Sequence, residues 1–73
     1  MSPYRHAYQR IVDDLVEKIN SGELRPGAKL PSGRELREQY DVSAMVVRTA
    51  ITILRDRGIV ESVSGVGVFV KED

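Results

Sequence analysis

The residues best suited to chemistry in this chain lie at the starts of two predicted helices. Ser32 and Glu35 match the S-x-x-E capping box, in which the serine hydroxyl accepts from one backbone amide while the glutamate reaches back to another. Ser43 has the residue type and position of a second N-cap. Two helices that start this close together are typical of a helix-turn-helix, whose second helix points its N-terminal amides at nucleic-acid phosphates.

The second of these helices begins with apolar residues. Ala44, Met45 and Val46 follow Ser43 directly, at the turn where a helix-turn-helix usually offers polar or charged groups to the bases. Ala44 and Val46 could contact the 5-methyl groups of thymines, which would change the preferred DNA sequence, or their apolar character could weaken binding. Met45 fits equally well with partial burial at the edge of the helix pair and with a contact to a base or a partner protein.

Three predicted helices and a hairpin position these residues. A helix over about 5–20 has apolar residues at spacings of three and four, and Gly22 is suited to end it. Shorter helices follow over about 32–39 and 43–57, and a glycine-punctuated β-hairpin over about 59–71 comes last. The predicted fold class is α+β, mainly α: a winged helix-turn-helix of three helices plus a C-terminal β-hairpin wing.

Length and charge describe one small domain over residues 1–73. Eleven basic residues balance eleven acidic ones, so the net charge is zero, whereas a free-standing nucleic-acid-binding domain is usually basic. Binding to DNA would therefore depend on where the arginines point. Within the connector after the first helix, Lys29 and Leu30 could add one short bridge to a sheet, although the sequence does not require it.

Several functional classes lack support in this composition. The chain has no cysteine and one histidine, His6, so we predict neither a metal site nor a cofactor. No residues have the spacing of a catalytic triad, and a domain of this size leaves little room for a substrate pocket, so we predict that it is not an enzyme. The chain has no apolar run long enough to span a membrane and no signal peptide, so we expect a cytoplasmic protein without a membrane partner.

A characteristic series of residues extends along most of the chain. It consists of Tyr8, Ile11, Gly22-Glu23-Leu24, Pro26-Gly27, Leu30-Pro31-Ser32, Arg34-Glu35-Leu36, Val42-Ser43, Val47-Arg48, Ala50-Ile51, Leu54, Gly58 and Gly65-x-Gly67-x-Phe69-Val70. In this order and spacing, from about residue 8 to residue 70, the chain resembles the N-terminal winged-helix domain of GntR-type bacterial transcriptional regulators.

The resemblance implies a bacterial transcription regulator, and in particular a repressor, that binds double-stranded DNA in a sequence-specific manner. The helix over 43–57 would enter the major groove, and the wing would approach the minor groove. The operator would be palindromic and bound by a homodimer, and a separate C-terminal domain would bind a small-molecule effector. A winged-helix module for protein–protein interaction, with weak or no DNA binding, is the alternative.

The resemblance also implies roles for individual residues. Arg34 resembles the arginine that reaches the operator, and Ser43 resembles the residue that bonds a phosphate. Arg48 resembles the arginine that contacts guanine or the DNA backbone, a role that suits the arginine fork. The other residues expected to face DNA are Ser32, Ala44, Met45, Val46, Thr49, Gly65 and Gly67.

Four positions depart from the pattern of the family. Ala44 stands where the family usually has arginine, and Val46 stands where a hydroxyl residue is common. In the hairpin, Ser64 replaces a basic residue and Val68 replaces a threonine. One base contact and up to three backbone contacts are therefore missing, and a good bidentate base contact is worth roughly 1–3 kcal/mol of discrimination.

Overall fold

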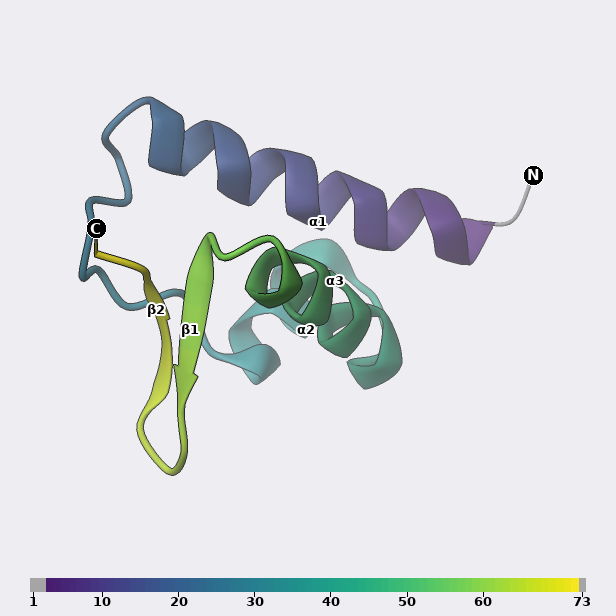
Figure 1. Ribbon diagram of the computed structural model, residues 1–73. Helices are drawn as coiled ribbons and strands as arrows, with labels where there is room; N and C mark the ends of the chain where they lie inside the picture. The colour runs from purple at the N-terminus through teal and green to yellow at the C-terminus, as the bar shows by residue number, and fades with distance from the viewer. Residues whose placement is uncertain (1–2, 73) are drawn as a thin grey trace.

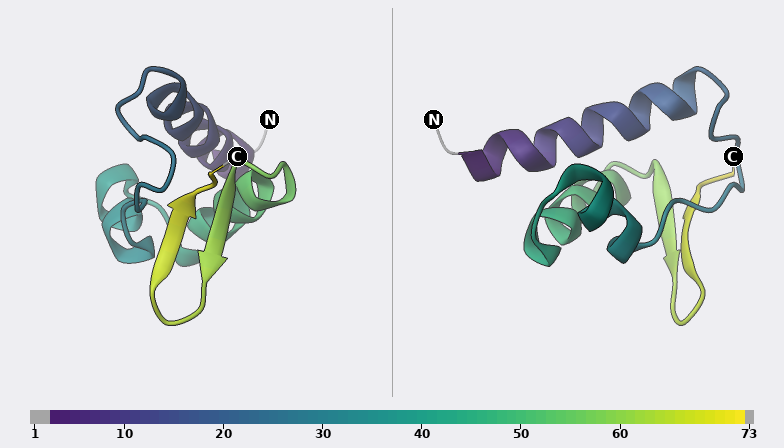
Figure 2. Two further views of the ribbon diagram at one scale, coloured as in Figure 1. Left: turned by 60° about the vertical axis from the view of Figure 1, so that its left-hand side comes forward. Right: turned by 180° about the vertical axis from the view of Figure 1, so that it is seen from behind.

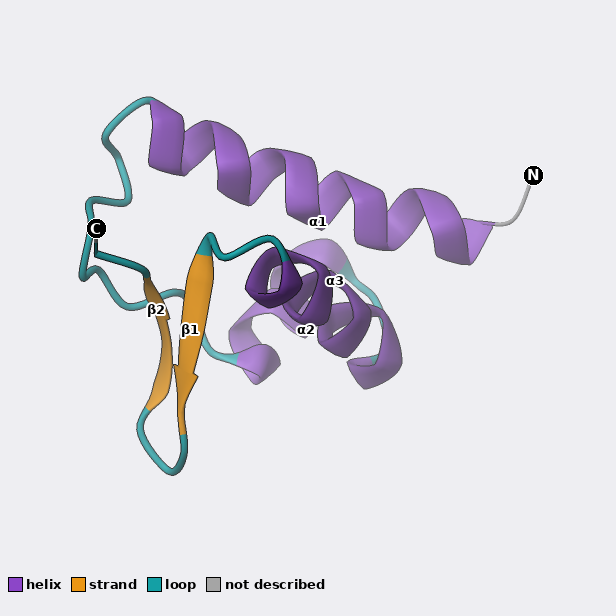
Figure 3. Ribbon diagram, viewed as in Figure 1, coloured by secondary structure: helices purple, strands orange, loops and turns teal. Residues whose placement is uncertain are grey.

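A computed structural model describes residues 3–72, with side chains from residue 7 onward (Figure 1). Three helices precede a two-stranded antiparallel sheet, so the predicted winged helix-turn-helix is confirmed (Figure 3). The elements are α1 (Pro3–Asn20), α2 (Gly33–Tyr40), α3 (Ala44–Asp56), β1 (Val60–Val63) and β2 (Gly67–Val70). None of the helices within residues 3–72 combines the length and the apolar character needed to span a lipid bilayer.

The first helix lies across one side of the molecule and packs mainly against α3 (Figure 1). It starts at Pro3, two residues before the predicted boundary, because proline suits the first helical turn, where an amide hydrogen has no helical partner. Gly22, with a φ of 87°, follows its end, and the Leu24 N–H donates to the Lys18 carbonyl at 2.9 Å. α1 therefore covers the core from the side opposite the hairpin tip (Figures 1 and 2).

Capping hydrogen bonds start both helices of the helix-turn-helix. The Ser32 Oγ accepts from the Glu35 N–H at 3.1 Å, and the Ser32 N–H donates to Glu35 Oε1 at 2.9 Å, so the predicted capping box is present. Asp41 follows α2 as its C-cap, in the left-handed conformation with a φ of 54°. Ser43 then caps α3 by accepting from the Val46 N–H at 3.3 Å. Both helices start one residue later than predicted, because a capping serine lies just outside the helix that it starts.

One hydrophobic core joins all five elements and the connector between α1 and α2. Its buried residues are Ile11, Val12, Leu15, Leu30, Leu36, Val46, Val47, Ala50, Leu54, Val60 and Val70. Complete burial of a large apolar side chain stabilises a fold by roughly 1.5–3 kcal/mol. Because every element contributes to the same core, packing fixes the positions of α2, α3 and the hairpin relative to one another.

The hairpin extends away from α1 and forms the wing (Figures 1 and 2). Val60 pairs with Val70 at its base, and Val63 pairs with Gly67 near its tip. Gly65, with a φ of 76°, provides the left-handed conformation that the tip needs, as expected for a hairpin glycine.

The connector runs along the outer edge of β2. Lys29 pairs with Phe69 in an isolated antiparallel bridge, so the bridge allowed by the sequence is present. Next to it, the Leu30 N–H donates to the Val68 carbonyl at 2.8 Å. The start of α2 is thereby tied to the wing, since Ser32 follows Leu30 by two residues.

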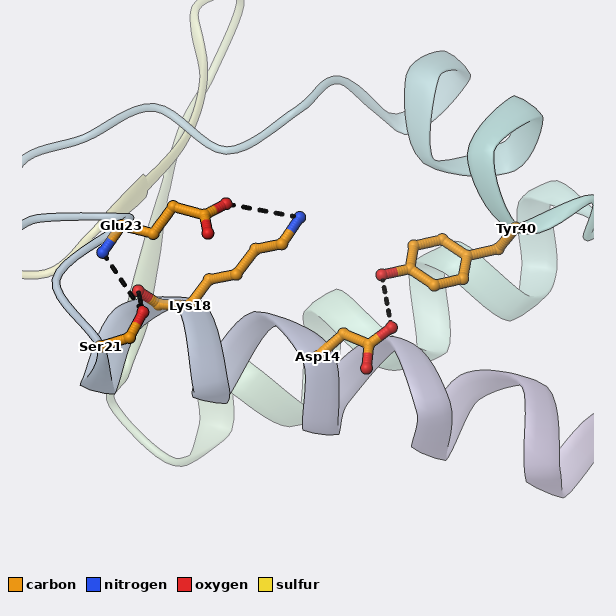
Figure 4. Close-up of polar contacts among 5 residues, drawn as sticks. All are labelled: Asp14, Lys18, Ser21, Glu23 and Tyr40. Carbon is orange, nitrogen blue, oxygen red and sulfur yellow. Dashed lines mark hydrogen bonds and ion pairs between the residues drawn. The ribbon is translucent and has the colours of Figure 1, made fainter.

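Polar contacts hold α1 at two points (Figure 4). The Tyr40 hydroxyl, at the end of α2, donates to Asp14 Oδ2 at 2.9 Å, and the Arg10 guanidinium lies 5.6 Å from the centre of the tyrosine ring. Partial burial and, to a lesser extent, the bond to Asp14 raise the pKa of Tyr40 to about 12. In the last turn of α1, Lys18 Nζ lies 3.9 Å from Glu23 Oε2 of the connector.

Candidate nucleic-acid interface

A groove of about 400 Å³ separates the outer face of α3 from the wing. We refer to it as the α3–wing groove. Its lining consists of residues 29–33 and Leu36, of Ala44, Val47, Arg48, Ile51, Thr52 and Arg55 from α3, and of residues 66–68 from the wing. Core packing and the bridge at Lys29 hold these three parts of the chain in place around it.

A second groove, of about 300 Å³, lies between the first turns of α2 and α3 and is called the α2–α3 groove below. It is lined by Gly33, Arg34, Arg37, Ala44 and Val47. Gly33, Ala44 and Val47 also line the α3–wing groove, so the two grooves adjoin each other. Together they form one surface onto which the N-terminal turns of both helix-turn-helix helices open.

The charge on this surface is of one sign. Lys29, Arg34, Arg37, Arg48 and Arg55 line the two grooves, whereas no aspartate or glutamate is among the described residues that line them. These five cations come from a chain whose net charge is zero. The fold therefore concentrates positive charge on one surface, as a polyanion would require.

Arg34 has an acidic neighbour just outside the grooves. Its Nε lies 3.9 Å from Glu38 Oε2, one turn later in α2, and the two side chains are 79% and 69% exposed. An exposed pair of this kind is worth about 0–1 kcal/mol, because water screens both charges. A phosphate can therefore compete with Glu38 for the Arg34 guanidinium.

The two capping serines lie at the edge of the surface. Ser32 lines the α3–wing groove, and Ser43 is exposed at the start of α3. Hydrogen bonding to Ser32 lowers the pKa of the Glu35 carboxyl from its usual value of 4.5, and the Ser32 backbone N–H has a larger effect than the Ser32 side chain. The positive charge of Lys29 also lowers this pKa, by a smaller amount. Both helix starts are therefore ordered by bonds within the chain.

The apolar start of α3 is divided between the surface and the core. Ala44 lines both grooves, and the Met45 side chain is 58% exposed. Val46 is only 5% exposed, so its side chain lies in the core, whereas it was predicted to face DNA. The physical reason is helical periodicity, because Val46 shares the buried stripe of α3 with Ala50 and Leu54 at intervals of four residues.

The remaining predicted residues lie at the margin of the surface. Thr49 is half-buried, and its Oγ1 donates to the Met45 carbonyl at 2.9 Å. Gly67 lines the α3–wing groove, while Gly65 lies at the wing tip. The side chain of His6 is outside the described residues.

Four polar residues of this surface were not predicted from the sequence. Thr52 and Arg55 continue the outward stripe of Arg48 at helical spacing, so the sequence contained a signal for them. Arg37 likewise lies one turn after a predicted arginine of α2. For Lys29 the sequence allowed only a short bridge to a sheet, and tertiary pairing is what brings it to the wing.

Comparison with known families agrees with this geometry. Residues 7–70 match the sequence model of the bacterial regulatory proteins of the gntR family. The chain belongs to the GntR family. The resemblance carried by its residues is therefore confirmed.

Two relatives of this GntR chain are named as repressors. It is 39% identical over 70 residues to the mannosyl-D-glycerate transport/metabolism system repressor MngR of Escherichia coli (strain K12). The matched residues make up 96% of this chain and 29% of that repressor. It is 40% identical over 65 residues to the HTH-type transcriptional repressor NagR of Bacillus subtilis (strain 168). This match makes up 89% of this chain and 27% of NagR. The GntR chain thus spans less than a third of the length of either relative.

Solved structures with the same fold include proteins bound to DNA. The DNA-binding domain of AraR in complex with operator ORR3 has a TM-score of 0.85 at 36% identity, over 88% of this chain and 77% of that one. The N-terminal domain of AraR in complex with a mutant ORR3 has a TM-score of 0.87 at 36% identity, over 96% of both chains. YtrA from Sulfolobus acidocaldarius, a GntR-family transcription factor, has a TM-score of 0.82 at 39% identity, over 90% of this chain and 56% of that one.

Proposed function

We propose that this GntR chain is the sequence-specific, double-stranded DNA-binding domain of a bacterial transcription regulator, specifically a cytoplasmic repressor. It acts by binding and not by catalysis. The observation that carries the proposal is the one-signed surface of the two grooves, where five cations gather in a chain of zero net charge. Further support comes from the AraR domains, which have this fold and are bound to operators.

In the proposed complex, α3 enters the major groove and the wing approaches the minor groove. The amides at the starts of α2 and α3 face phosphates, and Ser43 and Arg34 add side-chain contacts at the same place. Arg48, exposed one turn into α3, reads guanine or clamps the backbone through its planar fork.

The first turn of α3 reads bases through apolar contacts in this proposal. Ala44 and Met45 are the two exposed members of its apolar triplet, and both can pack against the 5-methyl group of thymine. The preferred half-site should therefore contain a thymine opposite this turn. Replacing that thymine with deoxyuridine removes only the methyl group and should weaken binding.

We also propose a homodimer that binds a palindromic operator, with the effector bound by a separate C-terminal domain. Support for a further domain comes from the length of the relatives, of which the matched segment makes up 29% and 27%. Residues 1–73 are then one domain of a larger regulator.

Selection of bound sequences from a random duplex library tests the proposal with the 73-residue chain. We expect one enriched motif, and two inverted copies at a regular spacing would report paired half-sites. Arg34→Ala and Arg48→Ala should each weaken binding to the selected duplex, by about tenfold or more for a base-reading contact. Arg57→Ala, which removes a cation that lines neither groove, is the matched control and should bind like the parent.

Two outcomes would contradict the proposed function. One is the absence of measurable binding to any duplex at low salt, and the other is binding that neither Arg34→Ala nor Arg48→Ala weakens. Either result would favour a protein-interaction module over a DNA reader.

A further inference from the structure

The wing hairpin itself offers no positive charge to DNA. Between Ile59 and Val70 the only charged residue is Glu61. Lys71 follows β2 at the base of the hairpin, at the opposite end from the tip. A wing that approaches the DNA backbone therefore needs a cation from another part of the fold.

Lys29 reaches the wing from the connector. Its backbone pairs with Phe69 in the isolated bridge, and hydrogen bonds on both sides of it keep the connector in register. In one of them the Val70 N–H donates to the Ala28 carbonyl, and in the other the Leu30 N–H donates to the Val68 carbonyl, each at 2.8 Å. Lys29 is thereby fixed beside β2.

The Lys29 side chain lies across Gly67, at the start of β2. A Cβ atom at position 67 would be 2.6 Å from Lys29 Cε and 3.6 Å from Lys29 Nζ, so a side chain at this position would displace the end of the lysine. Gly67 also has a φ of 150°, which residues with a side chain rarely adopt. The Lys29 side chain therefore lies along the wing, over a glycine that leaves space for it.

The ammonium group of Lys29 is available to an anion. The residue is exposed, and although its charge contributes to lowering the pKa of Glu35, it forms no ion pair with any other side chain in residues 7–72. It lines the α3–wing groove together with Arg48 and Arg55. Lys29 thus supplies, on the wing side of this groove, a positive charge that the hairpin itself lacks.

We infer that Lys29 is the phosphate contact of the wing, because its side chain lies over Gly67 and lines the α3–wing groove. The inference rests on the proposed function, since it needs this groove to face DNA. It adds to the DNA-binding residues a lysine that belongs neither to the helix-turn-helix nor to the hairpin.

The test is the salt dependence of binding to a short duplex of mixed sequence, measured by fluorescence anisotropy with the 73-residue chain. The slope of log affinity against log salt changes by about 0.9 for each phosphate neutralised on B-form DNA. Lys29→Gln should reduce the slope by this amount and lower the affinity at low salt. Lys29→Arg should keep the slope, and Lys71→Gln, which removes the same charge outside the groove, should also keep it.

The outcomes separate this inference from the proposed function. An unchanged slope for Lys29→Gln, or an equal reduction for Lys71→Gln, would overturn the inference while the chain still binds DNA. A parent chain that binds no duplex at low salt would overturn both. Thermal unfolding of each variant checks that the exposed substitutions leave the fold intact.

Discussion

At the scale of single residues, two hydrogen bonds between Ser32 and Glu35 set the start of α2. The Glu35 carboxylate is exposed, yet it accepts the Ser32 N–H at 2.9 Å, a donor that has no partner within the helix. Its negative charge also lies at the positive end of the helix dipole. Arg34, which lies between the two in the sequence, has a side chain that is 79% exposed in this first turn.

The stability contributed by the Glu35 carboxylate should be lost in acid. Its pKa in the folded chain lies below the usual 4.5, because the ionised form accepts the Ser32 N–H. A lowered folded-state pKa stabilises the fold above pH 4.5, and this stabilisation disappears as the pH falls through the folded value. Glu35→Gln can keep the capping bonds but does not titrate.

Urea unfolding at a series of acidic pH values checks this prediction. Between neutral pH and pH values below 4.5, the parent should lose more stability than Glu35→Gln does. Equal losses for the two proteins would show that the capping carboxylate does not contribute to acid sensitivity.

At the scale of elements, α2 is held at both ends by parts of the chain outside the helix-turn-helix. Its start follows the connector, which is bridged to β2, and its end carries Tyr40, which bonds to Asp14 of α1 (Figure 4). Its middle contributes Leu36 to the core. A short helix of this kind depends on such contacts, because helices of fewer than about 12 residues are marginal alone.

Tyr40→Phe should therefore loosen the contact between α1 and α2. The loss of one partly buried hydrogen bond should lower the free energy of unfolding by about 1 kcal/mol, measured by urea titration at neutral pH. The folded-state pKa of about 12 exceeds the usual 10, so the stabilisation is complete below pH 10 and is lost as the pH rises toward 12.

Titration of phenolate absorbance provides the second measurement. The parent should show a tyrosine that ionises near pH 12, and Tyr40→Phe should lack this component. If Tyr40→Phe were as stable as the parent, the hydrogen bond to Asp14 would add nothing to the free energy of unfolding beyond what the packing of the ring contributes.

At the scale of the whole molecule, the distribution of charge matters more than its sum. Eleven cations and eleven anions cancel, yet five cations meet at the two grooves. The acidic residues Asp13, Asp14 and Glu17 lie on α1, which is on the side opposite the wing tip (Figure 1). A chain of zero net charge can thus present a cationic face to DNA, and this attraction should weaken steeply with salt.

A pair of arginines two positions apart tests this view. Arg55 lines the α3–wing groove, and Arg57 lines neither groove. Arg55→Gln should therefore reduce the salt slope of duplex binding by about 0.9, whereas Arg57→Gln should leave it unchanged. The two variants have the same net charge, so equal slopes would show that total charge, and not its placement, governs binding.

The sequence by itself determined the order and the boundaries of the elements to within a few residues. The capping serines, the apolar stripe of α1 and the glycines of the hairpin act over a few neighbouring positions, so their signals are local. The exposure of Arg34 and Arg48 followed from the same helical periodicity. The family resemblance depended on these local features in their order.

Only the tertiary structure decided which residues share the candidate surface. Val46 was expected to face DNA, but it is buried because α3 presents that stripe to the core. Lys29 reaches the wing only because the connector pairs with β2, about forty residues later in the chain. The same packing gathers cations from separate elements on one face, which composition cannot reveal, because net charge is a sum over the chain whereas an electrostatic surface depends on position in space.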